Sequence, residues 1–311
     1  MDFSAHYHQS LIFLNEIRWE LLHGRTHNVL IDVRQLVEIS APAAIVLLAE
    51  LSRCTAYTQR QKSVRGNYPA SDRAKQMLRD VGFFAAFQVK APDITSPTKD
   101  RVYVRTASGN QSDGRYTRPF LSLFERVAAL TPLASKRLYS ALIECMDNVK
   151  AHAYDPSIIG DPNLVDEWWL GGFADPVRRR LALVFYDTGH GIPRTIKQRR
   201  MLRVANYARI SDARILERAV NVGFTRTRDN RRGNGLPSLK DFIDLAPGGF
   251  LRVASGSGDL TYRRQSKLSA KRLPVPMTGS LIIWTIEEQP SLEWDGAGDL
   301  IEAGEQISLR F

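Results

Sequence analysis

The sequence predicts an α/β protein in two parts, a small N-terminal strand-helix-strand-helix unit and a larger α/β segment that follows it. Three patterns support this fold class. A strand-like apolar run at 28–33 is followed by a long apolar helix pattern, and an amphipathic helix pattern covers 138–149. A second strand-like run, at 181–186, is broken at once by two glycines.

The N-terminal unit begins with a helix pattern at 7–22, where apolar residues recur at helical spacing. The buried strand at 28–33 follows. Ser40 is then expected to cap a helix that carries Pro42 in its first turn and continues through 43–51. The first half of the unit is therefore a strand followed by a helix.

The second half of the unit repeats this order. A short strand-like segment at 63–66 precedes a helix at 72–80, for which Ser71 is the expected N-cap and Gly82 the glycine that ends it. Strands that are joined through a crossover helix pair in parallel. We therefore expect a small parallel sheet.

The spacing of Leu30 to Val33, Ile39 to Ala43 and Leu78-x-x-x-Gly82-Phe83 resembles the STAS domain of anti-sigma-factor antagonists, over about residues 25–90. Those antagonists carry a phosphorylatable Ser or Thr where this chain has Ala41, and Ser40 reads as a helix cap instead. The resemblance therefore implies a docking or sensing domain at 1–95 that binds a protein partner. Turn-rich residues at 96–118, with a strand near 101–104, form the linker.

The candidate functional helix carries an apolar stripe of Leu138, Ala141, Leu142, Cys145 and Val149. Beside it lie Glu144, Asn148 and His152, four residues apart. Because a helix turns about 100° per residue, each step of four advances only about 40°, and the three side chains share one edge. They are either a ligand-binding edge or three polar neighbours on a solvated shoulder.

The second candidate segment is the bend that follows the strand at 181–186. Asp187 ends the strand, and Gly189 and Gly191 allow positive φ and a close approach of backbone to a ligand. A carboxylate at this place can accept a hydrogen bond from an exocyclic amine. An ordinary turn is the alternative.

Together with Arg232-Gly-Asn-Gly-Leu236, these two segments resemble the three ATP-binding motifs of the GHKL superfamily, in the order that the family has them. The His-Ala-Tyr ending at 152–154 is most similar to the anti-sigma-factor serine kinases of that superfamily. The resemblance implies a two-layer α/β sandwich, the Bergerat ATP-binding fold, at 119–290. In this fold a mixed sheet carries helices on one face.

The resemblance also implies roles for residues. Glu144 is the expected general base, Asn148 the Mg²⁺ ligand and Asp187 the group that reads adenine. Phosphates are expected at the start of the helix after Leu236, where free N–H groups and the helix dipole favour an anion. The implied ATP-binding set is Asn148, His152, Asp187, Gly189, Gly191, Ile192, Thr225, Arg226, Gly233, Gly235, Leu236 and Ser280. Arg226 is the candidate γ-phosphate sensor.

The formal net charge of +10 is concentrated between Lys197 and Gly235, where eleven basic residues face three acids. In the GHKL family this interval, here about 195–235, is the lid over the triphosphate. Basic side chains there would neutralise phosphate charge. A solvated helical face or a nucleic-acid partner are the alternatives. The C-terminal tail at 291–311 is acidic.

Several classes are not indicated. The longest apolar run, 41–49, is too short to cross a bilayer, and residues 1–6 do not read as a signal peptide, so we expect a cytoplasmic protein without a membrane partner. Cys54 and Cys145 have no metal-type spacing.

The sequence therefore predicts a Mg²⁺-dependent ATP-binding protein that hydrolyses ATP, or transfers its γ-phosphoryl group, to switch an interaction with a protein partner. One alternative is a serine protein kinase that acts on a separate STAS protein. Another is a regulator that binds nucleotide or nucleic acid without turnover. Homodimerisation stays open.

Overall fold

The structure of the protein is a computed structural model. It describes residues 1–2, 6–24, 28–58, 64–97, 102–128, 130–158, 165–175, 180–201, 209–222, 236–246, 248–264, 266 and 268–287.

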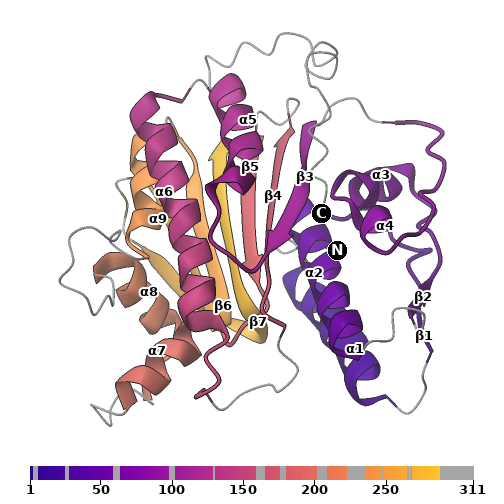
Figure 1. Cartoon of the computed structure of the whole chain (residues 1–311), viewed down its shortest axis with the longest axis horizontal. Coiled ribbons are helices and arrows are strands. Elements are labelled where there is room, and N and C mark those ends of the chain that lie inside the picture. The colour runs from indigo at the N-terminus through magenta and orange to yellow at the C-terminus, as the bar shows by residue number, and fades with distance from the viewer. Residues whose placement is uncertain are drawn as a thin grey trace.

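A five-stranded sheet forms the centre of the molecule (Figure 1). Its order is β3-β4-β5-β7-β6, with β3 at Val102–Gly109, β4 at Trp168–Asp175, β5 at Arg180–Asp187, β6 at Phe250–Arg263 and β7 at Ser269–Glu287. The predicted α/β class is confirmed. All four neighbouring pairs are antiparallel, so the predicted mixed sheet is wrong for these strands. Only four residues join β4 to β5, too few for the crossover that a parallel pair needs.

One face of the sheet is covered by helices that follow the linker. These are α5 (Arg118–Ala128), α6 (Pro132–Asn148), α8 (Asp212–Val222) and α9 (Ser238–Leu245), while α7 (Ile192–Met201) lies beside α8 (Figure 1). Thr131 caps α6 by accepting a hydrogen bond from the Ala134 N–H at 3.2 Å. Phe124, Leu142, Phe242 and Trp284 are completely buried between these helices and the sheet.

The opposite face is covered by α1 (Tyr7–His23) and α2 (Ala41–Thr58), the two long helices of the N-terminal unit (Figure 1). Their apolar side chains share one core with Val184, Leu281 and Ile283 of the sheet. Helices therefore lie on both faces, and the N-terminal unit supplies the second layer of them. None of the helices in the described ranges combines the length and the hydrophobicity that a bilayer crossing requires.

Within the N-terminal unit, β1 (Val29–Ile31) and β2 (Val64–Gly66) pair in parallel, as predicted. Helices α3 (Asp72–Asp80) and α4 (Phe83–Ala86) follow, and Gly82 between them has the left-handed φ of 87° that its predicted role requires.

The predicted caps are not formed by side chains. Pro42 does lie in the first turn of α2, but the Ser40 hydroxyl is buried and has no hydrogen-bond partner among the described residues. Ser71 occupies the N-cap position of α3 without a side-chain hydrogen bond to the helix. Both predictions identified the helix start correctly and the capping bond incorrectly.

We expect Gly279→Ala to lower the free energy of unfolding by about 3 kcal/mol. Gly279 has φ 65°, and a Cβ there would overlap the carbonyl oxygen of Asp187 in the neighbouring strand. Gly66→Ala is the matched control, because Gly66 has no positive φ and a Cβ would lie 3.5 Å from the nearest atom. Urea unfolding should show a change within about 0.5 kcal/mol for the control. Equal effects of the two substitutions would contradict this account.

Candidate functional site

The candidate functional helix is α6, and its predicted apolar stripe is buried: Leu138, Ala141, Leu142, Cys145 and Val149 all lie in the core. The α-helix ends at Asn148 and continues as a π-helical turn, Val149–Ala153. A π-turn advances fewer degrees per residue than an α-helix, so the predicted regular spacing holds from Glu144 to Asn148 but not on to His152. Such turns are frequent at functional sites.

Glu144 and Asn148 form a pair on the half-buried edge of α6. The Asn148 amide Nδ2 donates to Glu144 Oε1 over 3.4 Å. Burial raises the pKa of Glu144, the nearby Asp147 charge raises it further, and the Asn148 hydrogen bond opposes both. A carboxylate with a raised pKa accepts a proton more readily, which suits a general base.

Asp187 ends β5 as a buried carboxylate, with 5 % of its surface exposed. Its Oδ1 accepts the Gly189 N–H at 2.9 Å, and the Ser280 hydroxyl donates to the same carboxyl group. Burial raises the pKa of Asp187 to about 6, and these two hydrogen bonds oppose the shift. The structure thus places Ser280 directly beside Asp187, as its cross-strand neighbour.

The bend after Asp187 packs against the π-turn of α6. The His190 N–H donates to the Ala153 carbonyl at 2.8 Å, and a Cβ on Gly189 would overlap Ala153. The absence of a side chain at Gly189 therefore serves a close contact between two chain segments. Gly191, with φ 82°, turns the chain into α7, where the Ile192 N–H donates to Ser255 Oγ at 3.0 Å.

Electrostatics connect the two candidate segments. Burial raises the pKa of Cys145, and the charges of Glu144 and Asp187 raise it further. Both charges thus act on one thiol of α6, and the hydrogen bond from His190 to Ala153 joins the two segments directly. The helix edge and the double-glycine bend therefore lie in the same region of the molecule.

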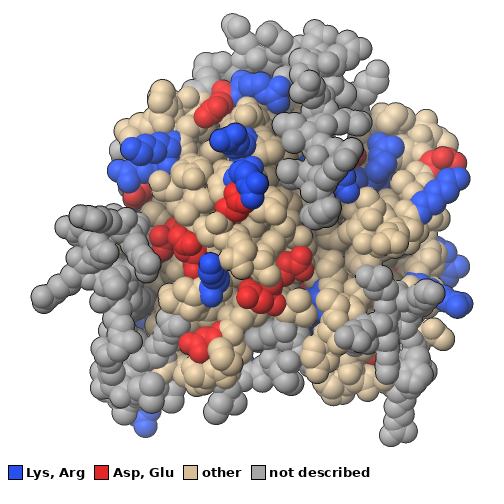
Figure 2. Space-filling model, viewed as in Figure 1, with Lys and Arg blue, Asp and Glu red and all other residues tan. Residues whose placement is uncertain are grey.

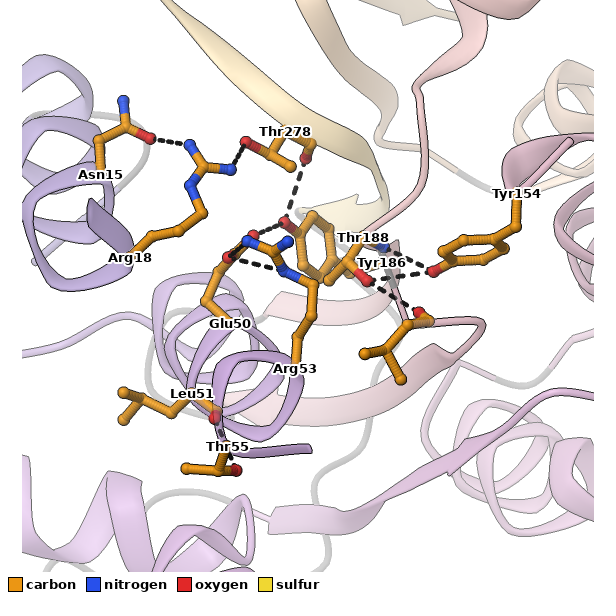
Figure 3. Close-up of polar contacts among 11 residues, drawn as sticks. Asn15, Arg18, Glu50, Leu51, Arg53, Thr55, Tyr154, Tyr186, Thr188 and Thr278 are labelled. Atoms are coloured by element: carbon orange, nitrogen blue, oxygen red, sulfur yellow. Dashed lines mark hydrogen bonds and ion pairs between the residues drawn. The ribbon is translucent and has the colours of Figure 1, made fainter. Parts of the chain in front are cut away.

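Three residues of this region lack a predicted role. The Tyr154 hydroxyl donates to the Glu167 carbonyl at 2.7 Å. It also accepts the Thr188 N–H at 3.2 Å and lies 3.1 Å from Thr188 Oγ1 (Figure 3). Ser255 Oγ contacts the Gly279 carbonyl at 2.7 Å. Tyr154 belongs to the recognised His-Ala-Tyr ending, so a signal existed. Ser255 reaches the site only through the β6–β7 pairing, which has no local signal.

In the described part of the predicted lid, α8 packs against the sheet while several basic side chains are exposed to solvent. Leu216 and Val220 of α8 are completely buried against the sheet, and Lys197 pairs with Asp212 at 2.7 Å. The other Asp212 oxygen accepts the Ser257 N–H at 2.8 Å. Arg209, Arg214 and Arg218 are exposed. On the face shown in Figure 2, acidic and basic side chains of the described residues are interspersed.

Two of the remaining predicted residues are half-buried, and four lie outside the described residues. Leu236 is half-buried ahead of α9, which begins at Ser238, one residue after the predicted start. His152 is half-buried in the π-turn. Thr225, Arg226, Gly233 and Gly235 lie outside the described residues.

No family model matches the chain, and a search of curated proteins finds no match.

We expect Asp187→Asn to stabilise the protein at pH 8 by about 2 kcal/mol and to change its stability little at pH 4. The folded pKa of about 6 lies above the unfolded value of 3.8, so the folded state binds the proton more tightly. The free energy of unfolding therefore falls as pH rises from about 4 to about 6, and levels off above that range.

Urea unfolding across this pH range measures the difference between variant and wild type. Asp93→Asn, which makes the same substitution at an exposed carboxyl group, is the control and should change the free energy of unfolding by less than about 0.5 kcal/mol. A constant offset between Asp187→Asn and wild type at all pH values would contradict the assignment.

Proposed function

We propose that this chain binds ATP, with Asp187 as the residue that reads the adenine amine. The observation that carries the proposal is a carboxylate buried at the end of a central strand, with a pKa raised to about 6 by that burial. Ionising such a group costs stability, which makes it a candidate for ligand binding. An exocyclic amine would supply the further hydrogen bond that the charge lacks.

Base selectivity follows from the same carboxylate. Ionised Asp187 only accepts hydrogen bonds, and Gly189 and Ser280 supply two donors from the protein. Adenine presents an amine as a further donor, whereas guanine presents a carbonyl oxygen at the equivalent position. Two acceptors facing each other in a buried place are unfavourable, so ATP is preferred over GTP.

The γ-phosphoryl group would react at the α6 edge. Glu144 has the raised pKa that a general base needs, and Asn148 Nδ2 orients it. That bond uses the amide nitrogen of Asn148, so its Oδ1 is the atom that suits Mg²⁺. Among the described residues no three or more His, Cys, Asp or Glu side chains form a metal cluster. Phosphate oxygens and water would therefore complete the Mg²⁺ shell, and the bound ion would offset phosphate charge.

The group that attacks is the hydroxyl of water or of a protein serine. Glu144 would orient either one and accept its proton. Transfer to a protein would make the chain a serine kinase, and transfer to water would make it an ATPase, with nucleotide-dependent binding of a partner as the outcome in both cases.

We expect Asp187→Asn to weaken ATP binding by at least about tenfold and to reduce the preference for ATP over GTP. An asparagine can donate to the guanine carbonyl, which the carboxylate cannot do. Calorimetric titration of wild type, Asp187→Asn and the Asp93→Asn control, each with and without Mg²⁺, measures this. Equal ATP affinity in wild type and Asp187→Asn would remove the adenine assignment.

We expect Glu144→Ala to retain ATP binding and to lose at least about 100-fold in turnover. Glu16→Ala, which makes the same substitution at an exposed glutamate of α1, is the control and should retain turnover. Release of labelled phosphate, with parallel detection of label on added STAS proteins, measures both reactions. Unchanged turnover in Glu144→Ala would exclude Glu144 as the base.

A further inference from the structure

Helix α2 carries a buried ion pair within its otherwise apolar sheet-facing part. Arg53 donates to Glu50 Oε2 from one terminal nitrogen at 2.8 Å and from Nε at 3.3 Å, and the residues are 0 % and 3 % exposed. Removing both charges from water is costly, and such a pair seldom stabilises a fold more than apolar side chains would. Its position therefore calls for a reason other than stability.

The pair reaches across to the sheet. The Tyr186 hydroxyl donates to Glu50 Oε1 over 2.8 Å and lies 3.1 Å from the Thr278 carbonyl (Figure 3). A phenol has one proton, so the Tyr186 hydroxyl donates mainly to Glu50, which is the charged acceptor and the nearer one. From α1, Arg18 donates to Thr278 Oγ1 and to Asn15 Oδ1. Both N-terminal helices thus hold β5 and β7 at the same place.

This place lies directly behind the candidate nucleotide site. Tyr186 precedes Asp187 on β5, and because side chains alternate along a strand, the two point to opposite faces of the sheet. Thr278 precedes Gly279 and Ser280 on β7, and Ser280 is the cross-strand neighbour of Asp187. A shift of α2 that displaces Tyr186 or Thr278 would move the backbone that carries Asp187 and Ser280.

We propose that Glu50, Arg53 and Tyr186 form a positioning network through which the N-terminal helices hold Asp187 and Ser280 in the geometry that reads adenine. The proposal rests on the proposed function. By thermodynamic linkage the effect is reciprocal, so a partner that shifts α2 changes ATP affinity, and ATP changes the affinity for that partner by the same factor. The N-terminal unit is then a regulator of the nucleotide site.

Tyr186→Phe tests the network, because it removes one hydroxyl and keeps the buried ring. Tyr262→Phe is the matched control: Tyr262 is also buried and donates to a carboxylate, Asp244, but lies seven residues along β6 from Ser255. We expect Tyr186→Phe to weaken ATP and adenosine binding by about tenfold and to leave Mg²⁺-tripolyphosphate binding unchanged. A general loss of folding would weaken all three ligands alike.

Hydrogen exchange gives a second readout that needs no nucleotide. Amides in 187–192 and 279–281 should exchange faster in Tyr186→Phe than in wild type, and at the wild-type rate in Tyr262→Phe. The double variant Glu50→Leu/Arg53→Met guards against misfolding, because apolar replacements of a buried pair often preserve stability. It should reproduce both effects of Tyr186→Phe.

The outcomes separate the two proposals. Equal effects of Tyr186→Phe and Tyr262→Phe on exchange would overturn the positioning network, as would unchanged exchange in the double variant. If wild type binds neither ATP nor adenosine, the proposed function fails, and the exchange comparison alone decides whether the network positions these strands.

Discussion

The burial of the Asp187 carboxylate is the constraint on which the geometry of this region depends. A carboxyl group in the core must be met by donors, and the chain provides the Gly189 N–H and the Ser280 hydroxyl. Each donor imposes a further requirement. The bend must fold back on itself at Gly189, which brings it against Ala153, and β7 must approach closely enough that only glycine fits at 279. The hydrogen bonds that one buried carboxylate needs therefore constrain three chain segments, which are the bend, the π-turn and β7.

Local patterns predicted most of the elements. The buried stripe of α6, the apolar run of β5 and the strand-helix-strand order of the N-terminal unit depend on residues close in sequence, so periodicity is sufficient to find them. The same holds for Asp187 and the glycines after it, which belong to one short motif. Ser280 was predicted in another way, because Gly279-Ser280 before a strand-like run resembles a late Gly-Thr motif of the GHKL superfamily.

The remaining features depend on contacts between distant residues. Tyr186 and Glu50 are 136 positions apart, and within the apolar run of α2 a single glutamate gives no sign of a partner in the sheet. Ser255 reaches the bend only through strand pairing. The π-turn that displaces His152 from the predicted helix edge arises where α6 meets the bend, and the antiparallel sheet follows from which strands become neighbours. None of these features produces a periodic pattern in the sequence nearby, so none could be predicted from such a pattern.

Two adjacent glycines in β4 allow helices on both faces of the sheet to pack closely against the same strand. A Cβ on Gly171 would overlap Ile45 of α2, and a Cβ on Gly172 would crowd Phe120 of α5 on the other face. Helices from both parts of the chain can therefore approach the sheet closely. Because close-packed layers transmit displacement instead of absorbing it, α2 cannot shift freely over the sheet. Coupling between the N-terminal unit and Asp187 then requires no moving hinge. It requires only two packed positions of α2 that differ in the hydrogen bonding of the Tyr186 hydroxyl.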